Sequence, residues 1–337
     1  MQDPRSSSPD RTAMDTRNAA SSTPADPAAA TATGPATQAA DAAAAQGGAD
    51  ASTEPRQQYV TPELRAWIVA QAQAGVPPEQ VLAAMQSSGW QEDVALKALE
   101  DTLQGFLAEH AKAQELPDPV PVPEPALADS PSFLQVPDRR VNILTSMKHP
   151  RVIVFGGLLS DAECDALVAL ARPRMARSET VDNATGGSEV NEARTSRGMF
   201  FERGETGLIQ TIEKRIGALL GWPVNNGEGL QVLHYTPGAE YKPHYDYFDP
   251  VHPGSVTILK RGGQRVGTLV MYLNTPEKGG GTTFPDVGLE VAPIKGNAVY
   301  FSYDRPHPST RSLHGGAPVV AGEKWVATKW LREGEFI

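Results

Sequence analysis

A histidine and an aspartate separated by one residue, His244 and Asp246, are the residues of this chain best arranged for chemistry. In a β-strand, residues i and i+2 point to the same face, so the imidazole and the carboxylate could bind one metal ion side by side. His314, in the sequence LHGG, supplies a third candidate ligand. Two imidazoles and one carboxylate form a facial triad that leaves three positions of an octahedral iron open.

A lysine follows His314 after ten residues and begins the sequence KWVATKW. Strand alternation would place Lys324, Val326, Thr328 and Trp330 on one face of that strand. Burying a lysine inside a sheet is costly unless the ammonium group meets an anion. The pattern therefore predicts an anionic ligand close to the metal, such as a dicarboxylate co-substrate.

These motifs and their order resemble the prolyl 4-hydroxylase family of Fe(II)- and 2-oxoglutarate-dependent dioxygenases. The resemblance covers about residues 150–333. It extends to LLS at 158–160, RTS at 194–196, QVLHY at 231–235, RV at 265–266, MYL at 271–273 and GGTTFP at 280–285. It implies a jelly-roll catalytic domain in which His244, Asp246 and His314 bind Fe(II).

The resemblance also implies roles for residues around the metal. Lys324 would pair with the distal carboxylate of 2-oxoglutarate. The other positions implied for that pocket are Tyr235, Thr282 and Trp330, and the positions implied near a peptide substrate, as catalytic residues, are Tyr241, Arg194 and Arg265. The implied reaction releases succinate and CO2 and hydroxylates prolyl residues of a polypeptide, with L-ascorbate (vitamin C) as the reductant.

Two alternatives stay open at this point. Arg332 stands two residues after Trp330, where some peptide-hydroxylating members of the family carry histidine. The same chemistry could therefore act on a free amino acid or a non-prolyl side chain, which a narrow, closed pocket would favour. The second alternative is a jelly roll without catalysis that serves as a binding module.

Hydrophobic patterns predict the elements that position these residues. Residues 152–155 form a predicted strand, Ser160 and Glu163 form a capping box at the start of a helix, and residues 208–220 form a second helix. Short strands between glycines and prolines follow at 229–236, 266–274, 289–292, 297–302, 310–314 and 323–331. Many short strands without interleaved helices favour a β-sandwich or jelly roll over a parallel sheet. The predicted class is α+β, a jelly-roll core with flanking helices.

The front of the chain has a different character. Residues 1–58 contain no Val, Ile, Leu, Phe, Tyr or Trp, so we expect a disordered tail. Helical periodicity with an N-cap at Thr61 predicts a small three-helix module over 59–112, which faintly resembles ubiquitin-associated modules and would bind a protein partner or self-associate. Residues 113–131 are a predicted Pro-rich linker, and the dioxygenase domain would span 132–337.

Composition excludes several classes of function. The chain has 337 residues and a formal net charge of −10, which argues against general nucleic-acid binding. No window has the roughly 20 apolar residues of a membrane helix, and no secretory signal is evident. Cys164 is the only cysteine, so we expect a core residue rather than a disulfide, and a cytoplasmic protein. Residues 183–193 and 250–263 are rich in turn formers and are predicted as mobile loops.

Overall fold

The computed structural model describes residues 58–337 except 179, 182–184, 186 and 190–193. The predicted tail, apart from Gln58, and most of the predicted loop 183–193 lie outside the described residues. The chain divides into two compact units, Met1–His110 and Ala111–Ile337. In the described ranges, no helix combines the length and the hydropathy that crossing a bilayer requires.

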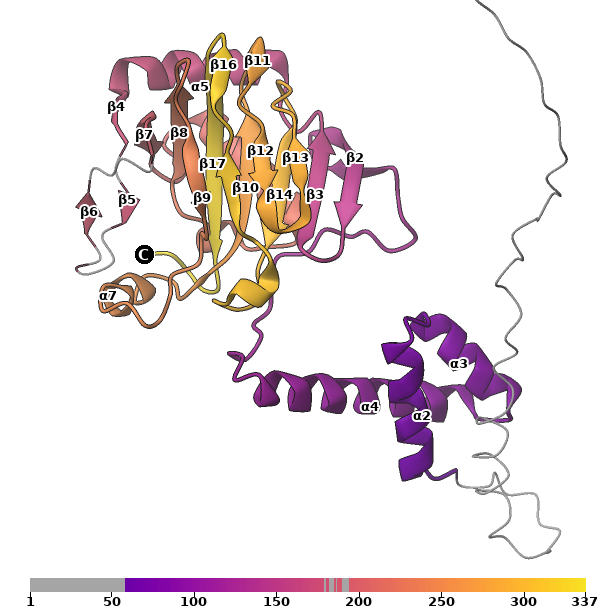
Figure 1. The fold of residues 1–337 in the computed structure, drawn as a ribbon. Helices are drawn as coiled ribbons and strands as arrows, with labels where there is room; N and C mark the ends of the chain where they lie inside the picture. Colours follow the sequence, from indigo (N-terminus) through magenta and orange to yellow (C-terminus); the bar gives the residue numbers. More distant parts are fainter. Residues whose placement is uncertain (1–57, 179, 182–184, 186, 190–193) are drawn as a thin grey trace, which may run out of the picture. The chain divides into compact units, whose positions relative to one another are not determined.

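The described part of the first unit is helical (Figure 1). It contains α2 (Pro62–Gln73), α3 (Pro78–Ser87) and α4 (Glu92–Ala113). The Thr61 side chain caps α2 by accepting a hydrogen bond from the Leu64 backbone nitrogen, and Pro62 occupies the first turn, as predicted. Leu64, Ile68 and Met85 are buried in the centre of a separate hydrophobic cluster. The unit therefore has a core of its own.

The second unit is built on two antiparallel sheets. The large sheet has the order β1-β2-β3-β14-β10-β17-β8-β7-β4, and the small sheet has the order β13-β12-β15-β9. The strands of the large sheet are β1 (Phe133–Val136), β2 (Arg139–Met147), β3 (Arg151–Gly156), β14 (Ala298–Ser302), β10 (Arg265–Tyr272), β17 (Lys324–Arg332), β8 (Leu230–Tyr235), β7 (Arg197–Phe201) and β4 (Ala176–Arg177). Those of the small sheet are β13 (Leu289–Val291), β12 (Thr282–Phe284), β15 (His314–Gly316) and β9 (Tyr241–His244). The predicted jelly roll is confirmed.

Two further short strand pairs are present: β11 (Lys278–Gly279) with β16 (Val319–Ala321), and β5 (Thr180–Val181) with β6 (Ser188–Glu189). The strand predicted over 310–314 is wrong, because a 3-10 turn at Pro308–Thr310 leads into Arg311 with a left-handed φ of 53°. The strand β15 begins only at His314. Residues 250–263, predicted as a loop, contain the short helix α7 (Ser255–Leu259).

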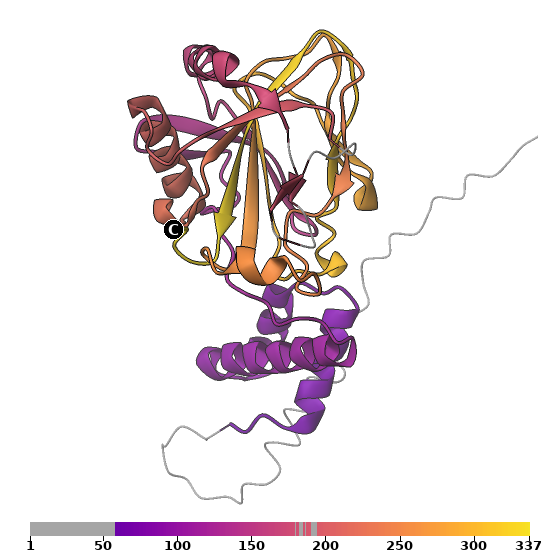
Figure 2. The same cartoon turned by 90° about the vertical axis from the view of Figure 1, so that its left-hand side faces the viewer.

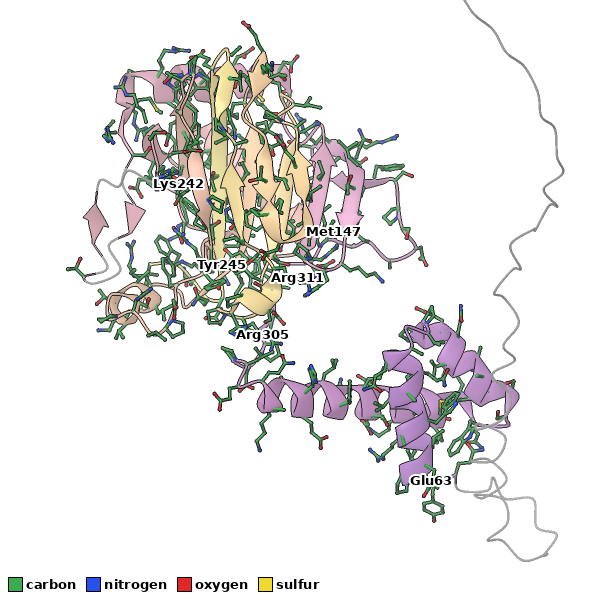
Figure 3. All side chains as sticks on the ribbon, viewed as in Figure 1. Glu63, Met147, Lys242, Tyr245, Arg305 and Arg311 are labelled. Atoms are coloured by element: carbon green, nitrogen blue, oxygen red, sulfur yellow. The ribbon has the colours of Figure 1, made fainter. Side chains whose placement is uncertain are left out.

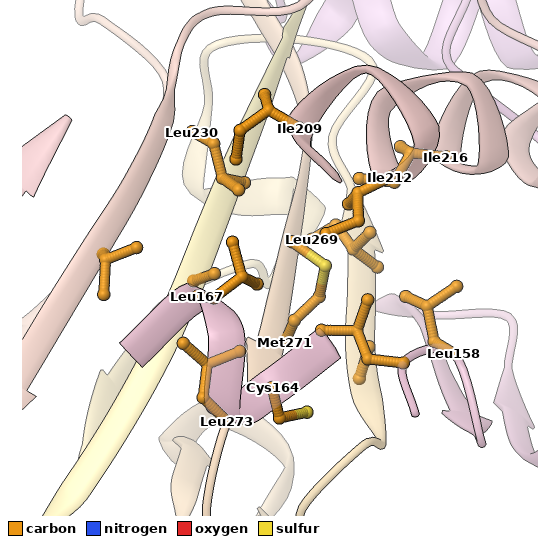
Figure 4. Packing of buried hydrophobic residues seen from close by; sticks show 14 of the residues in the cluster. Leu158, Cys164, Leu167, Ile209, Ile212, Ile216, Leu230, Leu269, Met271 and Leu273 are labelled. Atoms are coloured by element: carbon orange, nitrogen blue, oxygen red, sulfur yellow. The ribbon is translucent and has the colours of Figure 1, made fainter. Parts of the chain in front are cut away.

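Helices α5 (Asp161–Ala171) and α6 (Gly207–Leu220) cover one face of the large sheet (Figure 2). The predicted capping box is present, with the Ser160 hydroxyl accepting from the Glu163 backbone nitrogen and the Glu163 carboxylate accepting from the Ser160 backbone nitrogen. On α6, Ile209 lies beside Leu230 of β8 and Ile212 lies beside Leu269 of β10 (Figure 4).

Alternation along β10 gives the sheet a second, chemically different face. Leu269 and Met271 belong to the helix-covered core, while Tyr272 belongs to a second cluster that the small sheet covers. Thr268 and Val270 share the face of Tyr272, as the two-residue period requires. The site described below lies on this face, between the two sheets. Cys164 is fully buried in the helix-side core, away from that site, and burial raises the pKa of its thiol to about 11.

Candidate active site

Three potential metal ligands converge between the sheets. The ligand atoms of His244, Asp246 and His314 all lie within 4.8 Å of one another. His244 Nε2 is 3.6 Å from Asp246 Oδ1, and His314 Nε2 is 3.4 Å from Asp246 Oδ2. His244 and His314 come together because β9 pairs with β15 in a register that sets the two residues opposite each other. The convergence of residues some 70 positions apart in the chain is thus a consequence of strand pairing.

The orientation of both imidazoles follows from the local backbone. His244 Nδ1 lies 2.9 Å from the Lys242 carbonyl oxygen, and His314 Nδ1 lies 3.0 Å from the Ser312 carbonyl oxygen. A carbonyl can only accept, so each Nδ1 carries the proton and donates it. Each Nε2 therefore faces the carboxylate between them, and in the neutral form of the ring, which a metal ion requires, it carries the lone pair.

Asp246 is fixed by a chain of hydroxyl groups that sequence reasoning did not identify. Thr268 Oγ1 donates to Asp246 Oδ2 at 2.7 Å, so the 2.9 Å contact between Thr268 Oγ1 and the Tyr303 hydroxyl is donated by Tyr303. Burial opposes ionisation of Asp246, but the imidazoles of His314 and His244 outweigh it and hold the pKa of the carboxyl well below its usual range. The carboxylate is thus ionised and its second oxygen atom remains available.

Two neutral imidazole nitrogens and one carboxylate oxygen are a donor set for a divalent first-row metal ion such as Fe(II). His314 and Asp246 are buried, and His244 is partly exposed. Hydrogen bonds to the second atom of each ligand, as found here, orient the ligands of metal sites. The residues present therefore suit the metal that the sequence predicts.

A narrow inner cavity leads from these ligands to Lys324. The side chains of Lys324, Val326, Thr328 and Trp330 all line this cavity, as the alternation of β17 predicts. Tyr235, Thr282 and Gly316 line it as well. All four residues predicted for the anion pocket, Lys324, Tyr235, Thr282 and Trp330, are thus brought to one cavity that also contains the metal ligands.

Lys324 brings a buried positive charge to the end of the cavity. The side chain is 4 % exposed, and no hydrogen bond or ion pair links its ammonium group to a described residue. Its Nζ lies 5.3 Å from the centre of the Tyr235 ring. Burial lowers the pKa of Lys324 to about 8, although the Glu290 carboxylate opposes the shift. An unpaired, buried ammonium group of this kind is suited to bind a carboxylate.

Thr282 adds a polar group to the same cavity. The Tyr272 hydroxyl donates to Thr282 Oγ1 at 2.8 Å. Because the oxygen atom of Thr282 accepts this bond, its own proton is free to be donated to an acceptor in the cavity. Burial raises the pKa of Tyr272 well above its usual value, so the phenol keeps the proton that it donates.

An open groove of about 1150 Å³ lies outside the inner cavity. Tyr241, Arg194 and Arg265, predicted to lie near a peptide substrate, all line this groove together with His244 and Asp246. The guanidinium carbon of Arg194 is 4.7 Å from the centre of the Tyr241 ring, and Arg194 Nη2 donates to Gln231 Oε1 at 2.8 Å. The Tyr241 ring in turn stacks on His244, with ring centres 3.7 Å apart.

Glu228, which sequence patterns did not reveal, holds Arg265 of the groove and the buried Arg332. Glu228 accepts from Arg265 Nε at 2.7 Å and Nη2 at 2.9 Å, and from Arg332 Nε at 2.7 Å. The guanidinium carbon of Arg265 lies 4.0 Å from the Trp330 ring centre. Glu228 stands between two glycines, just before β8, and no local pattern marks it. Only the placement of β8, β10 and β17 side by side reveals its role.

Part of the chain is similar to known proteins. Residues 230–332 match the 2OG-Fe(II) oxygenase superfamily. The chain is 44 % identical over 209 residues to prolyl 4-hydroxylase 5 of Arabidopsis thaliana, covering 56 % of this chain and 70 % of the relative. It is 45 % identical over 201 residues to prolyl 4-hydroxylase 1 of the same plant, covering 55 % and 69 %. A solved structure is also similar: the viral collagen prolyl hydroxylase of Paramecium Bursaria Chlorella virus-1 as its 2OG complex. Its sequence is 31 % identical to this chain, the match covers 54 % of this chain and 95 % of the viral chain, and the TM-score is 0.42.

Proposed function

The chain belongs to the prolyl 4-hydroxylase family of Fe(II)- and 2-oxoglutarate-dependent dioxygenases, and we propose that it hydroxylates prolyl residues of a polypeptide. The observation that carries this proposal is one cavity with three metal ligands at one end and, at the other, a buried lysine that has no hydrogen-bond or ion-pair partner among the described residues. Two ends of this kind suit a ligand that chelates a metal and carries a second carboxylate. 2-Oxoglutarate has both properties.

The bound iron with its co-substrate supplies the oxidative chemistry, in which 2-oxoglutarate is converted to succinate and CO2 while one oxygen atom enters the substrate. The protein residues hold the components. His244, Asp246 and His314 bind the metal, and Thr268 keeps the Asp246 carboxylate in position. Lys324 pairs with the distal carboxylate of 2-oxoglutarate, and Thr282 donates a hydrogen bond to the same group.

The remaining residues of the inner cavity exclude water and shape the pocket. Tyr235 and Trp330 are 5 % and 7 % exposed, and both line the cavity. The Trp330 Nε1 atom is buried and has no hydrogen-bond partner among the described residues. A polar ligand in the cavity would provide the acceptor that this N–H group lacks.

The open groove favours a polypeptide substrate over a free amino acid. A groove of about 1150 Å³ exceeds what one amino acid fills, and small-molecule sites usually enclose most of the ligand. Tyr241 lies along this groove, where its hydroxyl can donate a hydrogen bond to a carbonyl oxygen of an extended chain. Arg194 and Arg265 line the groove beside it and are held by Gln231 and Glu228. Burial raises the pKa of Tyr241 to about 12, so its hydroxyl remains a donor.

The test is the release of labelled CO2 from 2-oxoglutarate by the Fe(II)-loaded chain, with and without Pro-rich peptides. We expect peptide-dependent release and hydroxyproline in the peptide, and neither with the Asp246→Ala variant. Release that requires a free amino acid instead of a peptide would contradict the prolyl claim. Failure of the metal-loaded protein to bind 2-oxoglutarate would contradict the whole proposal.

Three further points belong to the proposal. L-ascorbate would act as the reductant, which a stimulation of turnover by ascorbate would test. A cytoplasmic location is supported by the single cysteine, which leaves no internal disulfide to form. Leu96 and Leu107 on α4 are 52 % and 64 % exposed, and they support a protein partner for the module over 59–112. Pull-down with the isolated second unit as the control would test that partner.

A further inference from the structure

The chain carries a Pro-rich segment of its own beside the groove. Residues 116–125 read LPDPVPVPEP, with a proline at every second position. Proline fixes φ near −65° and disfavours the helical conformation of the residue before it, so the segment is extended and close to polyproline II. Such a segment is ordered before it binds and loses little conformational entropy in a groove.

Several hydrogen bonds attach this segment to the second unit. The Val120 backbone nitrogen donates to the Asp304 carbonyl oxygen at 2.7 Å. The Tyr300 hydroxyl donates to the Pro123 carbonyl oxygen, and Arg151 Nε donates to both oxygens of the Glu124 carboxylate at 3.0 and 3.1 Å. The segment is therefore attached to the second unit along part of its length, which its composition alone does not reveal.

The N-terminal end of the segment reaches the substrate groove. Glu115 and Pro117 line the same groove as His244 and Asp246. Pro117 is half-buried, whereas Pro119 and Pro121 are exposed and do not line the groove. Figure 3 shows Arg305, next to the residue that anchors Val120, at the same end of the jelly roll as Tyr245 of the groove. Five prolines line the groove in which, on our proposal, prolines react: Pro117, Pro243, Pro250, Pro306 and Pro308. Of these, only Pro117 belongs to the extended Pro-rich segment.

We propose that the chain hydroxylates itself at Pro117. This inference rests on the function proposed above. The C4–H bond of the proline ring breaks and a C4–OH bond forms. One atom of dioxygen enters the ring and the other enters succinate, and the oxidative decarboxylation of 2-oxoglutarate supplies the two electrons, with CO2 as the second product.

The reaction is intramolecular, because the anchor of the segment lies on the same unit as the groove. Three residue steps separate Pro117 from Val120, and an extended chain of that length spans about 10 Å. Pro117 can therefore move within the groove while the Val120 hydrogen bond is kept. Pro123 and Pro125 are buried, and the Pro123 carbonyl oxygen accepts from Tyr300, so these prolines have no such freedom.

The experiment incubates the full-length chain with Fe(II), 2-oxoglutarate and dioxygen, followed by trypsin and mass spectrometry. Cleavage after Lys112 and Arg139 releases residues 113–139, which contain no Met, Trp or Cys that could take up oxygen nonspecifically. We expect the mass of one oxygen atom on this peptide, located at Pro117 by fragmentation. It should depend on 2-oxoglutarate and be absent from the Asp246→Ala variant.

Matched variants test the position. Pro117→Ala should abolish the modification, whereas Pro119→Ala, at an exposed proline two residues away, should retain it. The fraction of chains modified per unit time should not change when the protein is diluted. A rate that falls with dilution, or oxygen at another proline, would overturn the assignment.

A free Pro-rich peptide, incubated in a parallel reaction, separates this inference from the function on which it rests. If that peptide is hydroxylated while residues 113–139 stay unmodified, the self-hydroxylation is refuted and the proposed function stands. If neither is hydroxylated and no CO2 is released, both are refuted.

Discussion

Replacing Lys324 by methionine tests the role of the inner cavity most directly. The change removes the charge and keeps a side chain of similar length. Lys324 is 4 % exposed, and its ammonium group has no ion-pair partner among the residues that the structure describes. The attraction that the variant loses is therefore the one to the bound ligand.

The expected loss follows from the charge pair. Two unit charges about 4 Å apart at an effective dielectric constant of about 20 attract by about 4 kcal/mol. At about 1.4 kcal/mol per factor of ten, the affinity for 2-oxoglutarate should fall about a thousandfold. The affinity for the metal should change little, because His244, Asp246 and His314 are not altered. The stability of the ligand-free protein should not fall, since a buried, unpaired charge is removed.

Calorimetric titration of 2-oxoglutarate into the Mn(II)-loaded protein, without dioxygen, measures the effect. Lys278→Met, at an exposed lysine on β11, is the matched control and should bind like the unaltered chain. A weakening of less than about tenfold in the Lys324→Met variant would refute the assignment of this lysine to the distal carboxylate.

The pH dependence gives an independent check on the same residue. Burial lowers the pKa of Lys324 to about 8, so the ligand-free site is protonated below that value and loses its charge above it. A carboxylate binds the protonated form, and its affinity should therefore fall as the pH rises above about 8, by up to tenfold for each pH unit. A 2-oxoglutarate affinity that stays constant from pH 7 to 10 would contradict binding through the protonated Lys324.

Three further substitutions address the metal ligands and the helix that supports the sheet. Thr268→Val removes the hydrogen bond to Asp246 and should weaken metal binding about 10- to 100-fold, measured by chelator competition. An unchanged metal affinity would contradict the role of Thr268 in holding Asp246. Gly315→Ala would put a Cβ atom 2.9 Å from the Tyr241 carbonyl oxygen. We expect this contact to force β9 and β15 apart and to reduce Mn(II) binding, whereas full Mn(II) binding would show that the two strands can adjust. Ser160→Ala should lower the free energy of unfolding by about 1 kcal/mol in urea titrations without changing turnover.

Local signals were sufficient to predict most of the elements. The cap at Thr61 and the capping box at Ser160 and Glu163 act within one helical turn, so the sequence shows them directly. Strand alternation also predicted which side chains of β17 line the cavity. The strand expected over 310–314 failed because Arg311 adopts a left-handed conformation that residue type does not reveal.

The surroundings of the metal ligands depend on contacts between distant strands, which patterns do not show. The hydroxyl chain from Tyr303 through Thr268 to Asp246 joins β10 to the residue that follows β14. Glu228 meets Arg265 and Arg332 only because three strands lie side by side. The resemblance to a known family predicted the ligands themselves, but not the groups that hold them.

The backbone carbonyls that orient the two imidazoles have a consequence for how such a protein can diverge. Each histidine is oriented by the carbonyl two residues before it in the same segment, of Lys242 in one case and of Ser312 in the other. Any residue type offers that carbonyl, so mutations at these two positions leave the hydrogen bond in place. Side-chain substitutions near the groove can therefore change which substrate binds during evolution, while the orientation of the two histidines is preserved.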